Sequence, residues 1–159
     1  MGIFNQHKVY ILVGVPGAGK STWVKNQEWA KDCAYASTDW YVEYYAASSG
    51  RTYSSVFEEA MPRAVEAMVQ QVKEARAEQK DIIWDQTSTS LKSRKKKLVM
   101  LPGYYPIAVV FRTPEKEELD RRLASRPGKE IPPHILEQFL NWWEEPTLEE
   151  GFKEIWYAT

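Results

Sequence analysis

The sequence predicts an α/β fold in which helices flank a parallel sheet. Short apolar runs alternate along the chain with longer stretches whose apolar residues recur at helical spacing. No internal repeat, low-complexity tract or linker divides the 159 residues, a length that suits a single hydrophobic core. We therefore expect one domain over residues 1–159.

Four short runs, VYILV, CAYA, DIIW and IAVVF, are the predicted strands. Each is apolar at successive positions, which suits strands that helices bury on both faces of a parallel sheet. The predicted strands span 9–13, 33–36, 81–84 and 107–111.

The longest helix is predicted between the second and third strands. Ser55 to Glu58 resemble a capping box at its start, and an apolar stripe follows at helical spacing. Pro62 is expected to kink or delay this helix, because proline lacks the amide hydrogen that an interior helical position uses. The apolar stripe comprises Phe57, Met61, Val65, Met68, Val72 and Ala75.

Two further helices are predicted after the fourth strand. The first is expected to begin with Thr113 as its N-cap and Pro114 in the first helical position, where the missing amide hydrogen costs nothing. The second covers HILEQFLNWW, residues 134–143, and ends before Pro146. The stretch RPGKEIPP, residues 126–133, joins the two helices. Its glycine and prolines predict an ordered but movable loop that could serve as a lid.

Composition and charge exclude several classes of protein. The net charge of −1 argues against a protein that coats nucleic acid, since such binding needs many phosphate contacts and a basic surface. The single cysteine, Cys33, cannot form an internal disulfide, and no stretch is long and apolar enough to span a membrane. MGIFNQHKVYILVG lacks the features of a secretion signal, and MGIFNQ those of a myristoylation signal. We therefore expect a cytoplasmic protein without a membrane partner.

One dense basic run, LKSRKKKL, covers residues 91–98. It is either the solvated face of a helix or a contact patch for nucleic acid. The residues alone leave both interpretations open.

A phosphate-binding loop follows the first predicted strand. Gly14 to Ser21 read G-x-x-x-x-G-K-S, and the helical stretch TWVKNQEWAK comes next. In that setting, backbone amides at the start of a helix wrap the phosphates of a nucleoside triphosphate. Lys20 is expected to reach the β and γ phosphates, and Ser21 to place its hydroxyl on Mg²⁺. The residues expected to bind the nucleotide, ATP or GTP, are Gly14, Pro16, Gly17, Ala18, Gly19, Lys20, Ser21 and Thr22.

The loop by itself leaves the reaction open, since motors, switches, synthetases and kinases share it. Ligands of such sheets bind beyond the carboxyl ends of the strands, so the polar residues after each strand are candidates. Asp39 follows the second strand and could take the proton of a hydroxyl acceptor, or it could cap the next helix. Asp85 follows the third strand and could hold Mg²⁺ through water, act as a helix cap, or do both.

Arg122 and Arg126 lie four residues apart, on one face of the helix before the predicted lid. Guanidinium groups in that place could neutralise the charge on a transferred phosphoryl group. The alternative is an exposed basic stripe that pairs with Glu118 and its neighbours.

Together these segments resemble, nearly from end to end, the kinase domain of the polynucleotide 5′-hydroxyl kinases of phage repair and their eukaryotic relatives. GVPGAGKSTW is similar to the family's phosphate loop, TDWY to the segment of its general base, and RRLASRPGKEIP to its lid. WDQTSTSLKSR is similar to its Asp-x-Thr-Asn stretch with a downstream Arg, and PTLEEGF to a segment near the end of the eukaryotic kinases. The resemblance implies a P-loop NTPase kinase fold with an arginine-bearing lid.

The resemblance also implies roles for individual residues. Asp39 falls on the general base, and Arg122 and Arg126 on the two lid arginines. Thr87 and Arg94 fall on the Asp-x-Thr-Asn stretch and its Arg. The residues expected at the catalytic centre are Lys20, Asp39, Arg122 and Arg126, and those expected at the acceptor are Asp39, Trp40, Thr87 and Arg94. Trp40 could stack on a base at the 5′ end of a strand, or pack in the core.

Two positions depart from the family pattern. Val42 stands where the phage enzyme has an Arg that helps to hold the acceptor's phosphate, and Ser88 replaces the Asn of Asp-x-Thr-Asn. Both changes fall on the acceptor side. The chain also lacks the Asp-x-Asp-x-Thr signature of the phosphatase that accompanies many family members, so a kinase domain alone is expected.

The sequence thus predicts an NTP- and Mg²⁺-dependent kinase of the 5′-hydroxyl end of RNA or DNA, an interpretation that the basic run and the lid favour. A kinase of the same fold that acts on a small hydroxylated molecule, such as a sugar, nucleoside or antibiotic, is the alternative. Val42 and the near-neutral charge support it. A third hypothesis is a nucleotide-dependent binding module without transfer activity.

Overall fold

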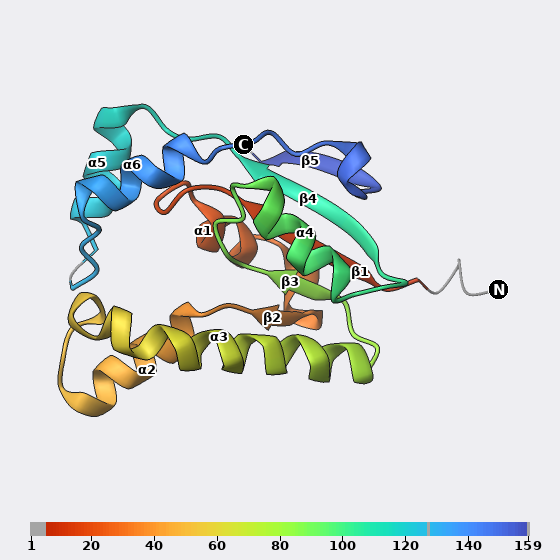
Figure 1. The fold of residues 1–159 in the computed structure, drawn as a ribbon, viewed down its shortest axis with the longest axis horizontal. Coiled ribbons are helices and arrows are strands. Elements are labelled where there is room, and N and C mark those ends of the chain that lie inside the picture. The colour runs from red at the N-terminus through yellow and green to blue at the C-terminus, as the bar shows by residue number, and fades with distance from the viewer. Residues whose placement is uncertain (1–5, 127, 159) are drawn as a thin grey trace.

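Five parallel strands form one sheet in the order β2-β3-β1-β4-β5 (Figure 1). The computed structural model describes residues 6–126 and 128–158. The strands are β1 (Lys8–Val13), β2 (Ala34–Ala36), β3 (Ile82–Trp84), β4 (Tyr105–Phe111) and β5 (Glu154–Ala158). The predicted class, a parallel sheet flanked by helices, is confirmed. Because β1 lies between β3 and β4, the loop that follows β1 leaves the sheet at the point where the strand order reverses.

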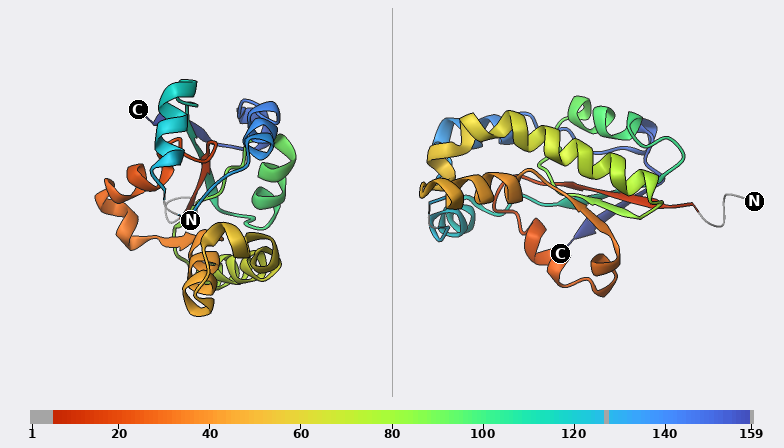
Figure 2. Two further views of the ribbon diagram at one scale, coloured as in Figure 1. Left: turned by 90° about the vertical axis from the view of Figure 1, so that its left-hand side faces the viewer. Right: turned by 90° about the horizontal axis from the view of Figure 1, so that it is seen from below.

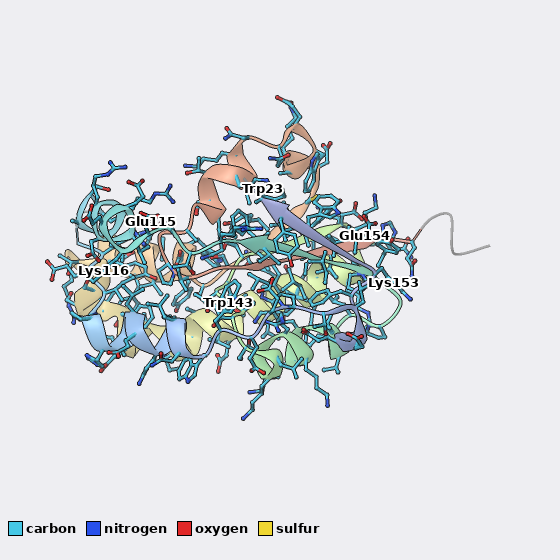
Figure 3. The ribbon with its side chains drawn as sticks, turned by 90° about the horizontal axis from the view of Figure 1, so that it is seen from above. Trp23, Glu115, Lys116, Trp143, Lys153 and Glu154 are labelled. Carbon is cyan, nitrogen blue, oxygen red and sulfur yellow. The ribbon has the colours of Figure 1, made fainter. Side chains whose placement is uncertain are left out.

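Helices cover both faces of the sheet (Figure 2). On one face, Val9, Ile11 and Val13 of β1 pack with Met68 and Val72 of α3 (Tyr53–Ala77). On the other face, apolar residues of β1 and β4 pack against α1 (Lys20–Lys25) and the short helix η2 (Glu28–Asp32). Trp23 and Trp143 belong to opposite faces, as Figure 3 shows from above. Alternate residues of one strand therefore serve two cores, which explains why the strands are apolar throughout.

A third apolar cluster joins α2 (Asp39–Ser49) to the first half of α3. Val42 is fully buried in it, against Val56, Ala60 and Ala64. The position that the resemblance placed at the acceptor therefore faces α3, and its branched side chain fixes how α2 lies on α3. This corrects the expectation that Val42 belongs to the acceptor side of the cleft.

The start of α3 differs from the expected one. Thr52 is the N-cap, and its hydroxyl accepts a hydrogen bond of 3.2 Å from the Ser55 amide, so the helix begins at Tyr53 and the predicted capping box lies inside it. The helix also continues through Pro62. Proline costs an interior hydrogen bond, but buried residues on either side of it hold one continuous helix face against α2 and the sheet.

The remaining helices also differ in their bounds. They are α4 (Leu91–Val99), α5 (Lys116–Ala124), α6 (Pro133–Asn141) and the short helix η3 (Leu148–Glu150). The N-cap of α5 is Glu115, which is extended, so Thr113 and Pro114 lie in the loop after β4 and line the cleft described below. The last predicted helix ends at Asn141 and starts at Pro133.

The fifth strand was not predicted. Its apolar residues Ile155 to Tyr157 follow two charged residues, and the strand lies at the edge of the sheet and is only partly buried. It therefore lacks the long continuous apolar run of an inner strand. A capping box between Thr147 and Glu150 turns the chain through η3 before the strand begins.

Among the described residues, no helix combines the length and the apolar character that crossing a membrane requires. Residues 1–5, which belong to the stretch predicted to lack export and myristoylation signals, lie outside the described residues. A cytoplasmic location stays a prediction.

Candidate active site

A cleft of about 2110 Å³ opens at the carboxyl ends of the strands. The phosphate loop forms its floor, between the end of β1 and the start of α1. α2, α3, α5 and α6 gather at this end of the sheet (Figure 1). The cleft therefore occupies the place where parallel α/β sheets bind their ligands.

The phosphate loop has the backbone that its glycines allow. Gly17 and Gly19 have φ angles of 88° and 100°, a region that glycine enters without steric cost. A Cβ atom on Gly17 would stand 2.8 Å from Cδ1 of Leu119, so α5 packs directly on the loop. The Gly14 amide donates a 2.9 Å hydrogen bond to the Thr87 carbonyl, which ties the loop to the segment after β3.

Lys20 folds over its own loop. Its Nζ donates to the carbonyls of Gly14 (2.9 Å) and Val15 (3.1 Å). Burial lowers the pKa of Lys20, while the charges of Asp85 and Asp39 act in the opposite direction. The ammonium thus already lies among the groups expected around the phosphates.

Asp85 and Ser21 share one neighbour, the phenol of Tyr35. Tyr35 donates a hydrogen bond to Oδ2 of Asp85, and Ser21 is within hydrogen-bond reach of the same phenol. Burial raises the pKa of Asp85, and the Tyr35 hydrogen bond and the Lys20 charge oppose that shift. Mg²⁺ prefers oxygen ligands and takes only one or two from the protein, so Ser21 and Asp85 fit the ion. Asp85 does not cap α4, because Ser90 does.

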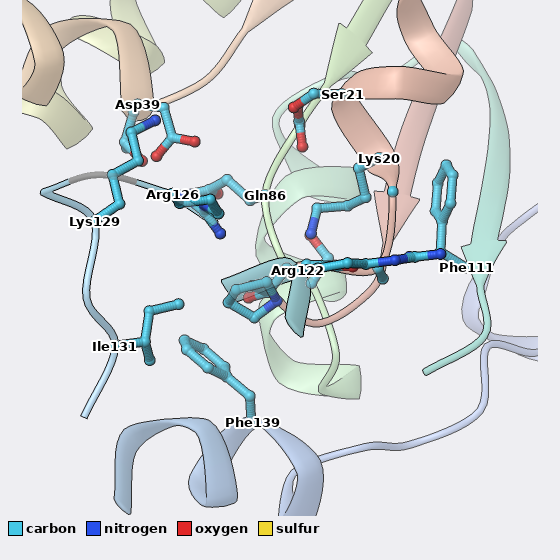
Figure 4. Close-up of a pocket in the computed structure, with 18 of the residues that line it drawn as sticks. Lys20, Ser21, Asp39, Gln86, Phe111, Arg122, Arg126, Lys129, Ile131 and Phe139 are labelled. Atoms are coloured by element: carbon cyan, nitrogen blue, oxygen red, sulfur yellow. The ribbon is translucent and has the colours of Figure 1, made fainter. Parts of the chain in front are cut away.

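Asp39 lies across the cleft from the phosphate loop, at the start of α2 (Figure 4). Its Oδ1 accepts a 2.6 Å hydrogen bond from the Tyr53 phenol. The alternative role of Asp39 as a helix cap is not seen. The backbone amide of Asp39 instead donates a hydrogen bond to Oγ of Ser37. Burial and the Asp39 charge raise the pKa of Tyr53 well above its usual range, so the phenol stays a donor at neutral pH.

Both arginines that were predicted to act from a lid reach the cleft. Arg122 Nη1 donates to the Gly17 carbonyl at 3.1 Å, while its Nε pairs with Glu118 at 2.8 Å. Arg126 lines the cleft, where its charge acts on both Lys20 and Tyr53. In Figure 4, Arg126 lies nearer to Asp39 and Arg122 lies below Lys20. The predicted pairing with Glu118 exists, and it holds Arg122 against the phosphate loop.

The loop between α5 and α6 is hydrogen-bonded to the start of α3. Ser54 Oγ donates to the Gly128 carbonyl and accepts from the Glu130 amide, both at 2.7 Å. Lys129 pairs with Glu43 and lies 4.9 Å from the ring centre of Tyr53. The loop therefore closes one side of the cleft; its movement as a lid stays a prediction.

Two of the four residues expected at the acceptor lie elsewhere. Arg94 is fully buried, pairs with both carboxylate oxygens of Glu150 and donates to the Ser88 carbonyl, so it cannot touch a substrate. The indole of Trp40 donates to Gln71 on α3 and is not among the residues that line the cleft. These positions correct the expected contacts of Arg94 and Trp40, whereas Asp39 and Thr87 do line the cleft.

The residues that line the cleft beyond the phosphate loop fall into two groups, which we call its two arms. The donor arm lies toward the ends of β4 and β5, where Trp23, Phe111 and Tyr157 line the cleft. The acceptor arm runs between α3, α4, α6 and the loop after α5. Tyr35 and Tyr53 were not singled out from the sequence as site residues. An isolated tyrosine carries no local signal, and each gains its role from a carboxylate on another element.

The sequence pattern of the AAA domain family AAA_33 matches residues 9–146, most of the chain. The chain belongs to the AAA_33 family. Membership agrees with the nucleotide binding that the phosphate loop, Gly14 to Ser21, predicts. The phosphate loop and the residues around Asp39 and Asp85 all fall within the matched part.

Solved structures share the fold of this AAA_33 domain at low identity. A Chloroflexus aurantiacus protein named as a kinase has a TM-score of 0.71 and 16% identity, over 96% of this chain and 85% of that one. A gluconokinase from Sinorhizobium meliloti 1021 has a TM-score of 0.57 and 17% identity, over 95% and 81%. One chain of the Pnkp1/Rnl/Hen1 RNA repair complex has a TM-score of 0.64 and 23% identity, over 86% and 44%. These likenesses establish the P-loop kinase fold.

Proposed function

We propose that this AAA_33 domain is a kinase that transfers the γ-phosphoryl group of a nucleoside triphosphate to a hydroxyl group of a small polar molecule. One observation carries the proposal. Asp39 faces the phosphate loop across a cleft whose acceptor arm is walled on its outer side by the loop hydrogen-bonded to Ser54. A walled arm of this kind suits a small acceptor better than the end of a long strand.

The residues suggest a direct transfer. The acceptor hydroxyl donates a hydrogen bond to Asp39 and gives up its proton to that carboxylate as its oxygen bonds to the γ phosphorus. The bond between the γ phosphorus and the bridging oxygen breaks, and the nucleoside diphosphate leaves. Lys20, Arg122 and Arg126 neutralise the charge on the transferred group. Mg²⁺ at Ser21 and, through water, at Asp85 would add charge neutralisation at the β and γ phosphates.

The positions of the predicted acceptor residues also favour a small molecule. Arg94 is committed to Glu150, and the exposed lysines of the basic run, Lys92, Lys95 and Lys96, are not among the residues that line the cleft. A gluconokinase is among the proteins of similar fold.

A kinase of 5′-hydroxyl ends is the second candidate. The similar chain of the RNA repair complex supports it, with the highest identity of the three structures quoted. The match of the lid segment to the polynucleotide kinases points the same way.

A parallel assay separates the candidates. We expect labelled phosphate to pass from ATP or GTP to members of a panel of sugars, sugar acids and nucleosides, and not to a 5′-hydroxyl oligonucleotide of RNA or DNA. Transfer to the oligonucleotide alone would overturn the proposal in favour of the second candidate.

The matched variants are Asp39→Asn and Asp32→Asn. Asp32 is an exposed carboxylate at the end of η2 and is not a cleft residue, so its variant should behave as wild type. Asp39→Asn should lose roughly 10²-fold or more in kcat with nucleotide binding retained, because the acceptor's proton has lost its base. Full turnover in Asp39→Asn would show that Asp39 is not the base, whereas nucleotide binding without transfer to any acceptor, in wild type as in the variant, would indicate a binding module.

A further inference from the structure

Lys97 is a buried lysine in the wall of the acceptor arm. It lies on the inner face of α4, one turn after Ser93, and both residues line the cleft. Only 7% of Lys97 is exposed. Its Nζ lies 3.5 Å from the Ser93 carbonyl and 5.7 Å from the ring centre of Trp84. Over residues 6–126 and 128–158, no ion pair joins it to a carboxylate.

The charges around Lys97 do not compensate its ammonium. Burial, and then the positive charges of Arg94 and Lys96, lower the pKa of Lys97 to about 8. Glu150, the nearby buried carboxylate, uses both oxygens on Arg94 and accepts from the Thr147 amide as well. On α3, Glu58 is a carboxylate that lines the same cleft, but it is exposed and forms no ion pair with Lys97. A buried ammonium in such surroundings lowers the stability of the fold. A negatively charged ligand that pairs with it would therefore gain binding affinity.

Ser88 adds a second unpaired donor to the same wall. It is 2% exposed, and its Oγ has no hydrogen-bond partner among the described residues. Its backbone has a φ of 47°, an uncommon value for a residue other than glycine, and Arg94 holds its carbonyl at 3.0 Å. Buried hydroxyls normally have a partner, so this one is free to bind a ligand.

We propose that Lys97 and Ser88 form a subsite for an oxyanion of the acceptor, a carboxylate or a phosphate ester. The proposal rests on the kinase function proposed above and names the class of its substrate. The Lys97 ammonium and the Ser88 hydroxyl offer hydrogen-bond donors and positive charge, which is what an oxyanion needs. Apolar residues that line the same arm, among them Met61, Ile135 and Phe139, lower the local polarity and so strengthen the ion pair. Phe139 and Ile131 face each other at its mouth in Figure 4.

The first test is binding without turnover. Isothermal titration of D-gluconate, D-glucose 6-phosphate and D-glucose into wild type, Lys97→Met and Lys95→Met distinguishes the two oxyanions from a neutral sugar. Lys95 is an exposed lysine on the outer face of the same helix and serves as the matched control. We expect one oxyanion to bind wild type and Lys95→Met roughly tenfold or more tightly than Lys97→Met, since a charged hydrogen bond is lost. Equal binding of both anions to all three proteins, or binding to none, would overturn the subsite.

The second test is kinetic and thermal. In Lys97→Met, the KM for an acidic acceptor should rise, while the KM for the nucleotide stays within about twofold. The melting temperature of the ligand-free variant should rise, because methionine keeps the apolar stem and removes the buried charge. A lower melting temperature with every KM unchanged would mean that Lys97 is only structural. Lys97→Gln replaces Lys97→Met if the latter fails to fold.

The two proposals fail in different ways. If wild type and Lys97→Met phosphorylate neutral sugars equally well and neither distinguishes acidic ones, the kinase function holds and the subsite is wrong. If the panel of small molecules gives no transfer and the oligonucleotide does, the proposed function is wrong.

Discussion

Two tyrosine phenols hold the two carboxylates of the cleft. Tyr53 donates to Asp39 and Tyr35 donates to Asp85, and in both cases burial and the neighbouring charge raise the pKa of the phenol. Both phenols therefore stay protonated donors at neutral pH. Each pair also joins two elements, α3 to α2 and β2 to the end of β3. At the scale of single residues, the carboxylates are thus oriented by partners far from them in the sequence.

The phosphate loop provides a prediction with an internal control. Gly17 and Gly103 share a φ of 88°, but a Cβ atom on Gly17 would stand 2.8 Å from Leu119, while none of the described atoms lies within 4 Å of one on Gly103. Gly17→Ala should therefore reduce nucleotide affinity, because α5 and the loop must separate. Gly103→Ala should lose only about 1 kcal/mol of stability, from the left-handed backbone, and bind nucleotide normally. Nucleotide titration and thermal melting of both variants measure this; equal affinities would contradict it.

At the scale of elements, one hydroxyl makes two of the contacts that hold the loop between α5 and α6; the Ser54 amide, which donates to the Gly128 carbonyl, and the Lys129–Glu43 pair make others. Ser54→Ala removes the bonds to the Gly128 carbonyl and the Glu130 amide, so the loop should leave α3 more often. Faster hydrogen exchange at residues 128–131 and a several-fold higher KM for the acceptor are expected. Ser49→Ala is the control, because the Ser49 hydroxyl bonds only to carbonyls of its own helix. Unchanged exchange in Ser54→Ala would show that other contacts hold the loop.

A second element-scale prediction concerns the anchor of α4. Arg94 and Glu150, 0% and 4% exposed in their side chains, join α4 to η3 and so to the edge strand β5. Arg94→Met leaves the Glu150 charge buried and alone, which should cost about 3–5 kcal/mol of unfolding free energy. Lys116→Met breaks an exposed pair with Asp120 and should change stability by roughly 0.5 kcal/mol or less. Urea denaturation of the two variants compares them; similar losses would refute the role of the buried pair.

At the scale of the whole molecule, Lys97 should change how the unfolding free energy depends on pH. Its pKa falls from the usual 10.5 to about 8 on folding, so between these values the unfolded chain binds more protons and stability rises with pH. Cys33 and Tyr10 act in the opposite direction at high pH, since burial raises their pKa values to about 11 and about 12. The difference between wild type and Lys97→Met isolates the lysine. The variant should exceed wild type in unfolding free energy most below pH 8, and this difference should shrink as the pH rises. A difference that does not change with pH would contradict a buried charge on Lys97.

The sequence by itself determined those parts of the protein that depend on a pattern of consecutive residues. The strands around Val9–Val13 and Ile107–Phe111 follow from unbroken apolar runs, and the phosphate loop follows from glycines, a lysine and a serine at fixed spacing between a strand and a helix. Asp39 and Asp85 could be named because polar residues after parallel strands meet at one edge of the sheet.

Only the tertiary structure decided which faces the helices turn toward the cleft. Val42 and Arg94 fall on the acceptor positions of a family pattern, the first as a departure from it, yet packing buries the first against α3 and the second against Glu150. The same packing brings Tyr53 to Asp39 and places Lys97, one lysine of a basic run, in the wall of the cleft. A helix can turn any face inward at nearly equal local energy, so contacts between segments far apart in the chain make that choice.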